Sequence, residues 1–179
     1  MGECVARRIC LRIRRGRPIF ADLLRANGGG VMVSLIPSAT NAAVNEWPAA
    51  EAAETARLKA LHPGEPDRVN AELQSWRTSH PVPPATFAEV ADHIDHIRRI
   101  AGIEHIAIGS DLEGDRLRIV GMDSAAGFQR LFTELARRGY GSGELQLIAR
   151  GNILRVIRQA ETISASLRAQ RSPTEQPMQ

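Results

Sequence analysis

The sequence of 179 residues predicts a helix-rich α/β fold with few strands, which run parallel. Two short runs, Val31 to Ile36 and Ile106 to Ile108, are almost wholly apolar, as are strands of a parallel sheet that is buried on both faces. Each run follows a helical pattern that ends at glycine. Amphipathic helical patterns fill most of the remaining chain, so helices cover a small sheet.

The basic residues are unevenly distributed. Residues 1–17 contain six arginines and one glutamate, which gives 6 − 1 = +5, whereas the whole chain has a formal net charge of +3. The remaining chain therefore carries 3 − 5 = −2, and no nucleic-acid partner is predicted. We interpret residues 1–17 as an atypical basic segment outside the domain. A basic amphipathic element that touches a membrane or nucleic acid is the alternative.

The first half of the chain alternates helix and strand signals. A short helix over 20–26 stops at Asn27 and the glycines that follow, and Pro37 closes the strand that begins at Val31. Two further helices are expected at 42–61, with a kink or a break at Pro48, and at 67–78. This long helical excursion between the two strands is either a packing insertion or a lid over a site.

The helix before the second strand has the strongest local signals. Thr86 and Glu89 form the sequence pattern of a capping box, and Gly102 stands where a positive φ ends a helix. The apolar residues between them recur at helical spacing: Val90, Ile94, Ile97 and Ala101. We therefore predict a helix that buries one face on the sheet.

Three more helices are expected after the second strand. Residues 115–120 are a loop or an irregular edge, and helices follow over 124–138, from Ser142 onward, and over 152–167. Residues 169–179 contain two prolines and are expected to be a disordered tail. The predicted domain therefore covers residues 18–168.

Several blocks of the sequence together resemble the membrane (renal-type) dipeptidase family. That family has a pattern close to ADHIDHI…GSDFDG where this chain has VADHIDHIRRIAG and HIAIGSDLEG at 90–102 and 105–114. Three further blocks also resemble the family: NGGGVMV at 27–33, RRGY at 137–140 and GNILRV at 151–156. The resemblance spans roughly residues 21–165.

The resemblance implies a zinc metallopeptidase on a TIM-like (β/α)8 barrel that hydrolyses dipeptides with two zinc ions. Such a barrel needs about 250 residues, so the chain is expected to be its C-terminal part, truncated before the metal ligands. The family's ligands are an HxD pair, a bridging glutamate and two histidines, and their positions would precede residue 20 here. We therefore expect no zinc site in this chain alone and doubt its independent activity.

Asp111 is the candidate catalytic and substrate-binding residue. It directly follows the second strand, where a carboxylate is costly to bury unless it meets a cation, a proton or hydrogen-bond donors. The resemblance implies that it engages the substrate amine or the catalytic water; a helix-capping role is the alternative. Glu113 departs from the family, which has aspartate there. His93 and His96 share a helix face, but the resemblance favours surface or packing roles for both.

The expected partner of the complete enzyme is a dipeptide. Two strands cannot close a barrel, so exposed strand edges could also cause self-association. The sequence shows no membrane span and no signal peptide, which leaves the cytoplasm as the default compartment. A non-catalytic α/β fragment or interaction module is the alternative function.

Overall fold

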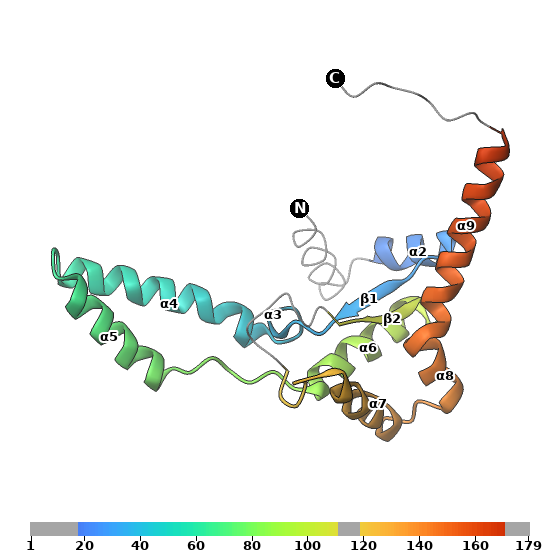
Figure 1. Ribbon diagram of the computed structural model, residues 1–179. Helices are drawn as coiled ribbons and strands as arrows, with labels where there is room; N and C mark the ends of the chain where they lie inside the picture. Colours follow the sequence, from blue (N-terminus) through green and yellow to red (C-terminus); the bar gives the residue numbers. More distant parts are fainter. Residues whose placement is uncertain (1–17, 111–118, 171–179) are drawn as a thin grey trace.

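The computed structural model describes residues 18–110 and 119–170 of the chain (Figure 1). At its centre, β1 (Val31–Ser34) and β2 (Ile106–Gly109) form a two-stranded parallel sheet, as the sequence predicts. Val31 pairs with Ile106 and Ser34 with Gly109, so both carboxyl ends lie at the same edge. The helix α2 (Pro18–Asn27) precedes β1 and ends at the glycine turn, where Gly28 has a φ of 66°.

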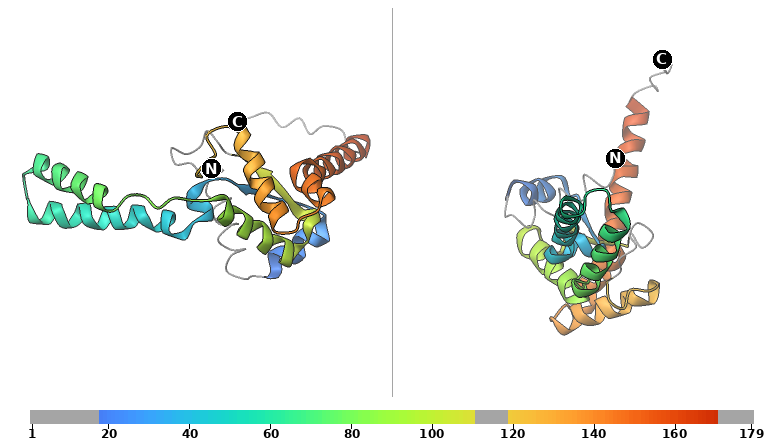
Figure 2. Two further views of the ribbon diagram at one scale, coloured as in Figure 1. Left: turned by 90° about the horizontal axis from the view of Figure 1, so that it is seen from below. Right: turned by 90° about the vertical axis from the view of Figure 1, so that its left-hand side faces the viewer.

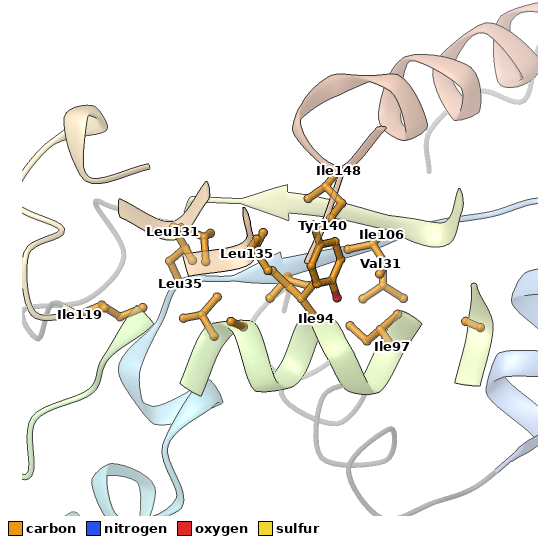
Figure 3. Packing of buried hydrophobic residues seen from close by; sticks show 14 of the residues in the cluster. Val31, Leu35, Ile94, Ile97, Ile106, Ile119, Leu131, Leu135, Tyr140 and Ile148 are labelled. Atoms are coloured by element: carbon orange, nitrogen blue, oxygen red, sulfur yellow. The ribbon is translucent and has the colours of Figure 1, made fainter. Parts of the chain in front are cut away.

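The helix α6 (Phe87–Ala101) supplies the main face that packs on this sheet. Its predicted apolar positions are all buried: Val90, Ile94, Ile97 and Ala101. Figure 3 shows Ile94 and Ile97 packed in the same cluster as Val31 and Ile106 of the strands. Gly102 ends α6 with a φ of 106°, which confirms the predicted positive φ, and the 3₁₀ turn η1 (Ile103–His105) leads into β2.

The C-terminal helices complete the core. Leu131, Leu135 and Ile148 are fully buried in the same cluster. The predicted helix over 124–138 begins with a separate 3₁₀ turn, and the last helix runs through Gln170, two residues into the segment expected to be a tail. The elements are η2 (Ala125–Gly127), α7 (Phe128–Arg137), α8 (Ser142–Gln146), the π-helical turn η3 (Leu147–Gly151) and α9 (Asn152–Gln170).

The excursion after β1 is a helical hairpin. A short helix α3 (Pro37–Thr40) is followed by α4 (Ala42–Leu61) and α5 (Pro66–Ser79), which lie side by side and project from the body (Figures 1 and 2). The hairpin has its own small cluster of Leu58, Val69 and Leu73, with Trp76 packed against it. The helix α4 continues past Pro48, which excludes a break there.

Aromatic contacts hold the two helices together where the hairpin joins the body. The rings of Trp76 and His80 stack at 4.7 Å, and Trp47 lies 5.9 Å from Trp76. Trp47 Nε1 also donates to the carbonyl oxygen of His80 at 2.8 Å. These contacts therefore join the start of α4 to the end of α5.

Candidate active site at the carboxyl ends of the strands

The carboxyl edge of the sheet brings together the residues that end β1 and β2. Ser34 pairs with Gly109, and the Ser34 hydroxyl accepts a hydrogen bond from the Ile36 N–H at 3.3 Å. A Cβ on Gly109 would lie 3.3 Å from Met32 Cβ, so the absence of a side chain permits close packing here. Ser110, which directly follows, is exposed at this edge.

Asp111, the predicted catalytic and substrate-binding residue, lies outside the described residues, as does Glu113. The structure fixes the two flanks of the segment that contains them. Its first flank is Ser110, at the carboxyl edge. Its second flank is Ile119, which forms an isolated parallel bridge with Ala85, and the adjacent Val120 N–H donates to Ala85 O at 2.8 Å. The segment therefore starts at the carboxyl edge, where parallel sheets usually have their catalytic and ligand-binding residues.

A serine that the sequence analysis did not single out lies beside this edge. The Ser38 hydroxyl oxygen, in α3, is buried and has no hydrogen-bond partner among the residues described. Two positions on, the Thr40 hydroxyl donates to Pro37 O at 3.2 Å. No sequence signal separates these two hydroxyls, because only the fold shows which one lacks a partner. Ser38 is therefore a candidate polar contact for a ligand at this edge.

One carboxylate joins the base of the hairpin to α6. Glu89 accepts from the Thr86 N–H at 2.7 Å, which confirms its predicted place in the capping box. Its other oxygen accepts from Asn41 Nδ2 at 2.6 Å. Asn41 in turn caps α4, because its Oδ1 accepts from the N–H groups of Ala43 and Val44. The Asn41–Glu89 pair thus connects the start of α4, where the hairpin begins, to the start of α6, which follows the hairpin.

The aspartates of the DHIDH block form an ionic cluster with the RRGY block. Arg138 Nη1 donates to Asp92 at 2.7 Å and to Asp95 at 2.6 Å, and its Nε donates to Glu134 at 2.8 Å. The Tyr140 hydroxyl donates to the second oxygen of Asp95 at 2.7 Å. The cluster fixes α6 against the end of α7, and α6 leads directly into β2.

The cluster also shifts the acidity of its members. Burial raises the pKa of Tyr140 above its ordinary value, and the hydrogen bond to Asp95 and the charge of that carboxylate raise it further. Hydrogen bonds from Arg137 and then Arg138 lower the pKa of Glu134 to about 2. Burial opposes the charged form of Arg138, but the hydrogen bonds to its carboxylate partners outweigh it and raise its pKa.

The opposite edge of the sheet is held by the GNILRV block. Asn152 is buried, and its Nδ2 donates to Ile103 O at 2.8 Å and to Ile106 O at 2.7 Å. His105 is buried just before β2, where its Nδ1 lies 2.6 Å from Gly29 O, so that nitrogen donates to the carbonyl oxygen. His105 therefore lies at the amino-terminal edge of the sheet, away from the candidate site.

No group of three or more histidine, cysteine, aspartate or glutamate side chains within 18–110 and 119–170 could hold a metal ion. His93 is buried in α6, and the half-buried His96 ring lies 3.0 Å from an Arg99 nitrogen, so both pack with the helix. His62 is the residue that follows the end of α4, and its Nε2 lies 3.2 Å from a Glu72 carboxylate oxygen. Within the same ranges, every helix is too short or too polar to cross a bilayer.

Comparison with known proteins places these features in a family. The family described as Membrane dipeptidase (Peptidase family M19) matches residues 21–171. Dipeptidase 3 of Rattus norvegicus is 44% identical over 79 residues, which is 44% of this chain and 16% of that protein. Dipeptidase 3 of Homo sapiens is 42% identical over 91 residues, 51% of this chain and 18% of that protein. Dipeptidase verJ of Clonostachys rogersoniana is 35% identical over 83 residues, 46% of this chain and 21% of that protein.

A solved structure has the same fold over most of the chain. The probable dipeptidase PvdM from Pseudomonas aeruginosa matches with a TM-score of 0.53 and 24% identity, over 77% of this chain and 38% of that one. The chain spans less than a quarter of the length of each of the three curated relatives named above. Because the family match covers most of the chain, the protein belongs to the membrane dipeptidase family.

Proposed function

We propose that this chain forms one wall of a site that hydrolyses the peptide bond of dipeptides, with Asp111 as the side chain that orients the substrate amine or the attacking water. The observation that carries the proposal is the parallel pairing of Ser34 with Gly109 in a chain of this family. This pairing puts the start of the Asp111 segment at the carboxyl edge of the sheet. An aspartate there supplies a fixed negative charge for a substrate ammonium group.

The wider architecture that fits this role is a (β/α)8 barrel, of which β1, β2 and the helices around them would be one sector. The names of the relatives and the fold shared with a probable dipeptidase support this reading. Zinc would supply Lewis-acid chemistry in the complete enzyme, but the described residues do not fit a zinc centre. Its ligands would therefore come from polypeptide outside these residues, and the role of this chain is to position substrate.

Two further groups at the edge suit the same task. The Ser38 hydroxyl is buried and has no partner among the described residues, so it would serve as an acceptor if a bound substrate reached it. The Glu89–Asn41 pair holds the base of the hairpin beside the edge, so it would keep the site's rim in place. The hairpin itself would shape the entrance.

The test uses a chimaera in which residues 21–171 replace the matching segment of a longer family member with measured dipeptidase activity. We expect the chimaera to hydrolyse dipeptides and Asp111→Asn to lower kcat/KM by about 10²-fold, the usual effect of removing one electrostatic contact to the reacting groups. Asp123→Asn is the matched control, because Asp123 is an exposed carboxylate in the loop just after the Asp111 segment. A folded chimaera without activity, or one that Asp111→Asn leaves unchanged, would rule the proposal out.

The second candidate function is a non-catalytic module that associates through its sheet. The observation that favours it is Met32, which projects from β1 with 53% of its surface exposed. Large exposed apolar side chains on short open sheets favour pairing with another chain. We expect the 179-residue chain to associate at high concentration and Met32→Lys to shift it toward the monomer in light scattering. Equal masses for both proteins at every concentration would argue against association through this face.

A further inference from the structure

A groove lies between the C-terminal end of α2 and the part of α9 from Arg155 to Ile163. It has a volume of about 490 Å³ and is lined by Asn27, Arg155, Arg158, Gln159, Thr162 and Ile163. Arg155 locates it, because this side chain donates to Gly28 O just before β1 and to Glu104 O just before β2. The groove is therefore at the amino-terminal edge of the sheet, opposite the candidate active site.

Two arginines line the groove. Among the described residues that line it, none is acidic. Within the described part of the chain, Arg155 donates to neutral oxygens: Gly28 O at 2.5 Å, Glu104 O at 2.8 Å and Gln159 Oε1 at 3.1 Å. The guanidinium of Arg158 forms no ion pair or hydrogen bond with any residue in the described ranges. Two guanidinium groups thus line the groove, and neither forms an ion pair with a carboxylate of the described residues.

The amide side chains in the groove are oriented so that donors remain available. Asn27 Oδ1 accepts a hydrogen bond from the Gly29 N–H at 2.7 Å. Its side-chain oxygen is therefore already bonded, and its NH₂ group remains as a donor for a ligand. Gln159 Oε1 accepts from Arg155, which leaves the NH₂ group of Gln159 in the same way. Because both oxygens already have partners, the unused capacity of the groove is mainly that of hydrogen-bond donors.

We propose that this groove binds a small organic anion whose carboxylate or phosphate group lies between Arg155 and Arg158. Guanidinium groups bind these planar or multi-oxygen anions with paired, charge-assisted hydrogen bonds. Ile163 has 60% of its surface exposed on the same wall, so it offers an apolar surface to a short aliphatic part of the ligand. The proposal goes beyond dipeptide hydrolysis and does not depend on it.

The experiment titrates the 179-residue chain with hexanoate, inorganic phosphate and hexanol, and follows heat release and the Nε–Hε resonance of Arg158. We expect saturable one-to-one binding of hexanoate and phosphate, and none of hexanol. Tighter binding of hexanoate than of phosphate would assign the ligand to carboxylates with an aliphatic part, and the reverse order would assign it to phosphates.

The variants separate a built site from general surface charge. Arg158→Gln should weaken anion binding by about tenfold, as expected for one charge-assisted contact. It should fold normally, because the Arg158 guanidinium bonds no residue of the described part of the chain. Arg168→Gln is the control, since Arg168 is exposed on the same helix but does not line the groove. The proposal fails if neither anion binds saturably, or if both variants weaken binding equally.

Discussion

Arg138 Nη1 donates to Asp95 Oδ2 over 2.6 Å, although 43 residues separate the two in the chain. The bond joins two of the sequence blocks that resemble the dipeptidase family. In this structure, the carboxylates of the DHIDH block serve as anchors for an arginine and a tyrosine, while its histidines pack within α6. The block therefore contributes to the site indirectly, by fixing the helix that leads into β2.

Replacing Arg138 should destabilise the fold. Arg138→Gln leaves Asp92, Asp95 and Glu134 without their shared cation, and we expect the free energy of unfolding in urea to fall by about 2 to 3 kcal/mol. Arg137→Gln is the control, because Arg137 is largely exposed and, within the described residues, bonds Glu134 alone, so its loss should cost less than about 1 kcal/mol. Equal losses for the two variants would contradict a special role for Arg138.

Tyr140 provides a direct test of the cluster by pH titration, because it is the only tyrosine in the chain. Burial and Asp95 raise its pKa, so the folded state favours the neutral phenol. Its contribution to stability is complete below the unfolded pKa of about 10 and is lost as the pH rises toward the folded value. Tyrosinate absorbance should therefore appear only above the pH range in which an unperturbed tyrosine ionises.

Two variants check the assignment of that titration. Tyr140→Phe should abolish the tyrosinate step, and Asp95→Asn should move the step to lower pH because the negative charge is gone. The step should stay above the ordinary value in Asp95→Asn, since burial remains. A native protein that ionises with an ordinary tyrosine pKa while still folded would contradict the structure of the cluster.

Asn152 should be sensitive to substitution because both of its bonds are made to carbonyl groups beside the sheet. Asn152→Ala leaves Ile103 O and Ile106 O without this donor, and we expect a loss of about 2 to 3 kcal/mol in the free energy of unfolding. Asn70→Ala, at an exposed position of α5, should change stability by less than about 0.5 kcal/mol. Similar values for the two variants would show that the Asn152 bonds contribute little.

Ser38 and Thr40 form a matched pair of hydroxyls on one short helix. Ser38→Ala removes a buried hydroxyl that has no partner in the described ranges, so stability should stay the same or rise by up to about 1 kcal/mol. Thr40→Val removes the bond to Pro37 O and should cost about 1 kcal/mol. Thermal unfolding of both variants measures the difference, and a large loss in Ser38→Ala would mean that its hydroxyl has a partner in solution.

The sequence predicted those parts of the fold that depend on neighbouring residues. The helix α6 is the clearest case: Glu89 and Gly102 define its ends through local backbone geometry, and the spacing of Val90 and Ile94 defines its buried face. Parallel pairing of the two apolar runs followed from their composition. Each of these signals depends on residues close together in the chain, so each can be recognised from one amino-acid sequence.

The remaining features depend on contacts that only the folded chain brings together. The spacing of Asp92 and Asp95 puts both on one helix turn, but nothing in the sequence identifies Arg138 as their partner. The partnership of His62 with Glu72 depends in the same way on how α4 and α5 pair. The placement of Asp111 stays a prediction, since it lies outside the described residues.

The hairpin also bears on how the chain folds. Pairing β1 with β2 requires the closure of a long loop, and the entropic cost of closure rises with loop length. Because α4 and α5 contact each other and share their own cluster, they can form early from local contacts. Asn41 Nδ2 then bonds Pro84 O at the other end of the excursion, so the preformed hairpin shortens the segment that has to close. Loosening the hairpin should therefore slow the formation of the sheet.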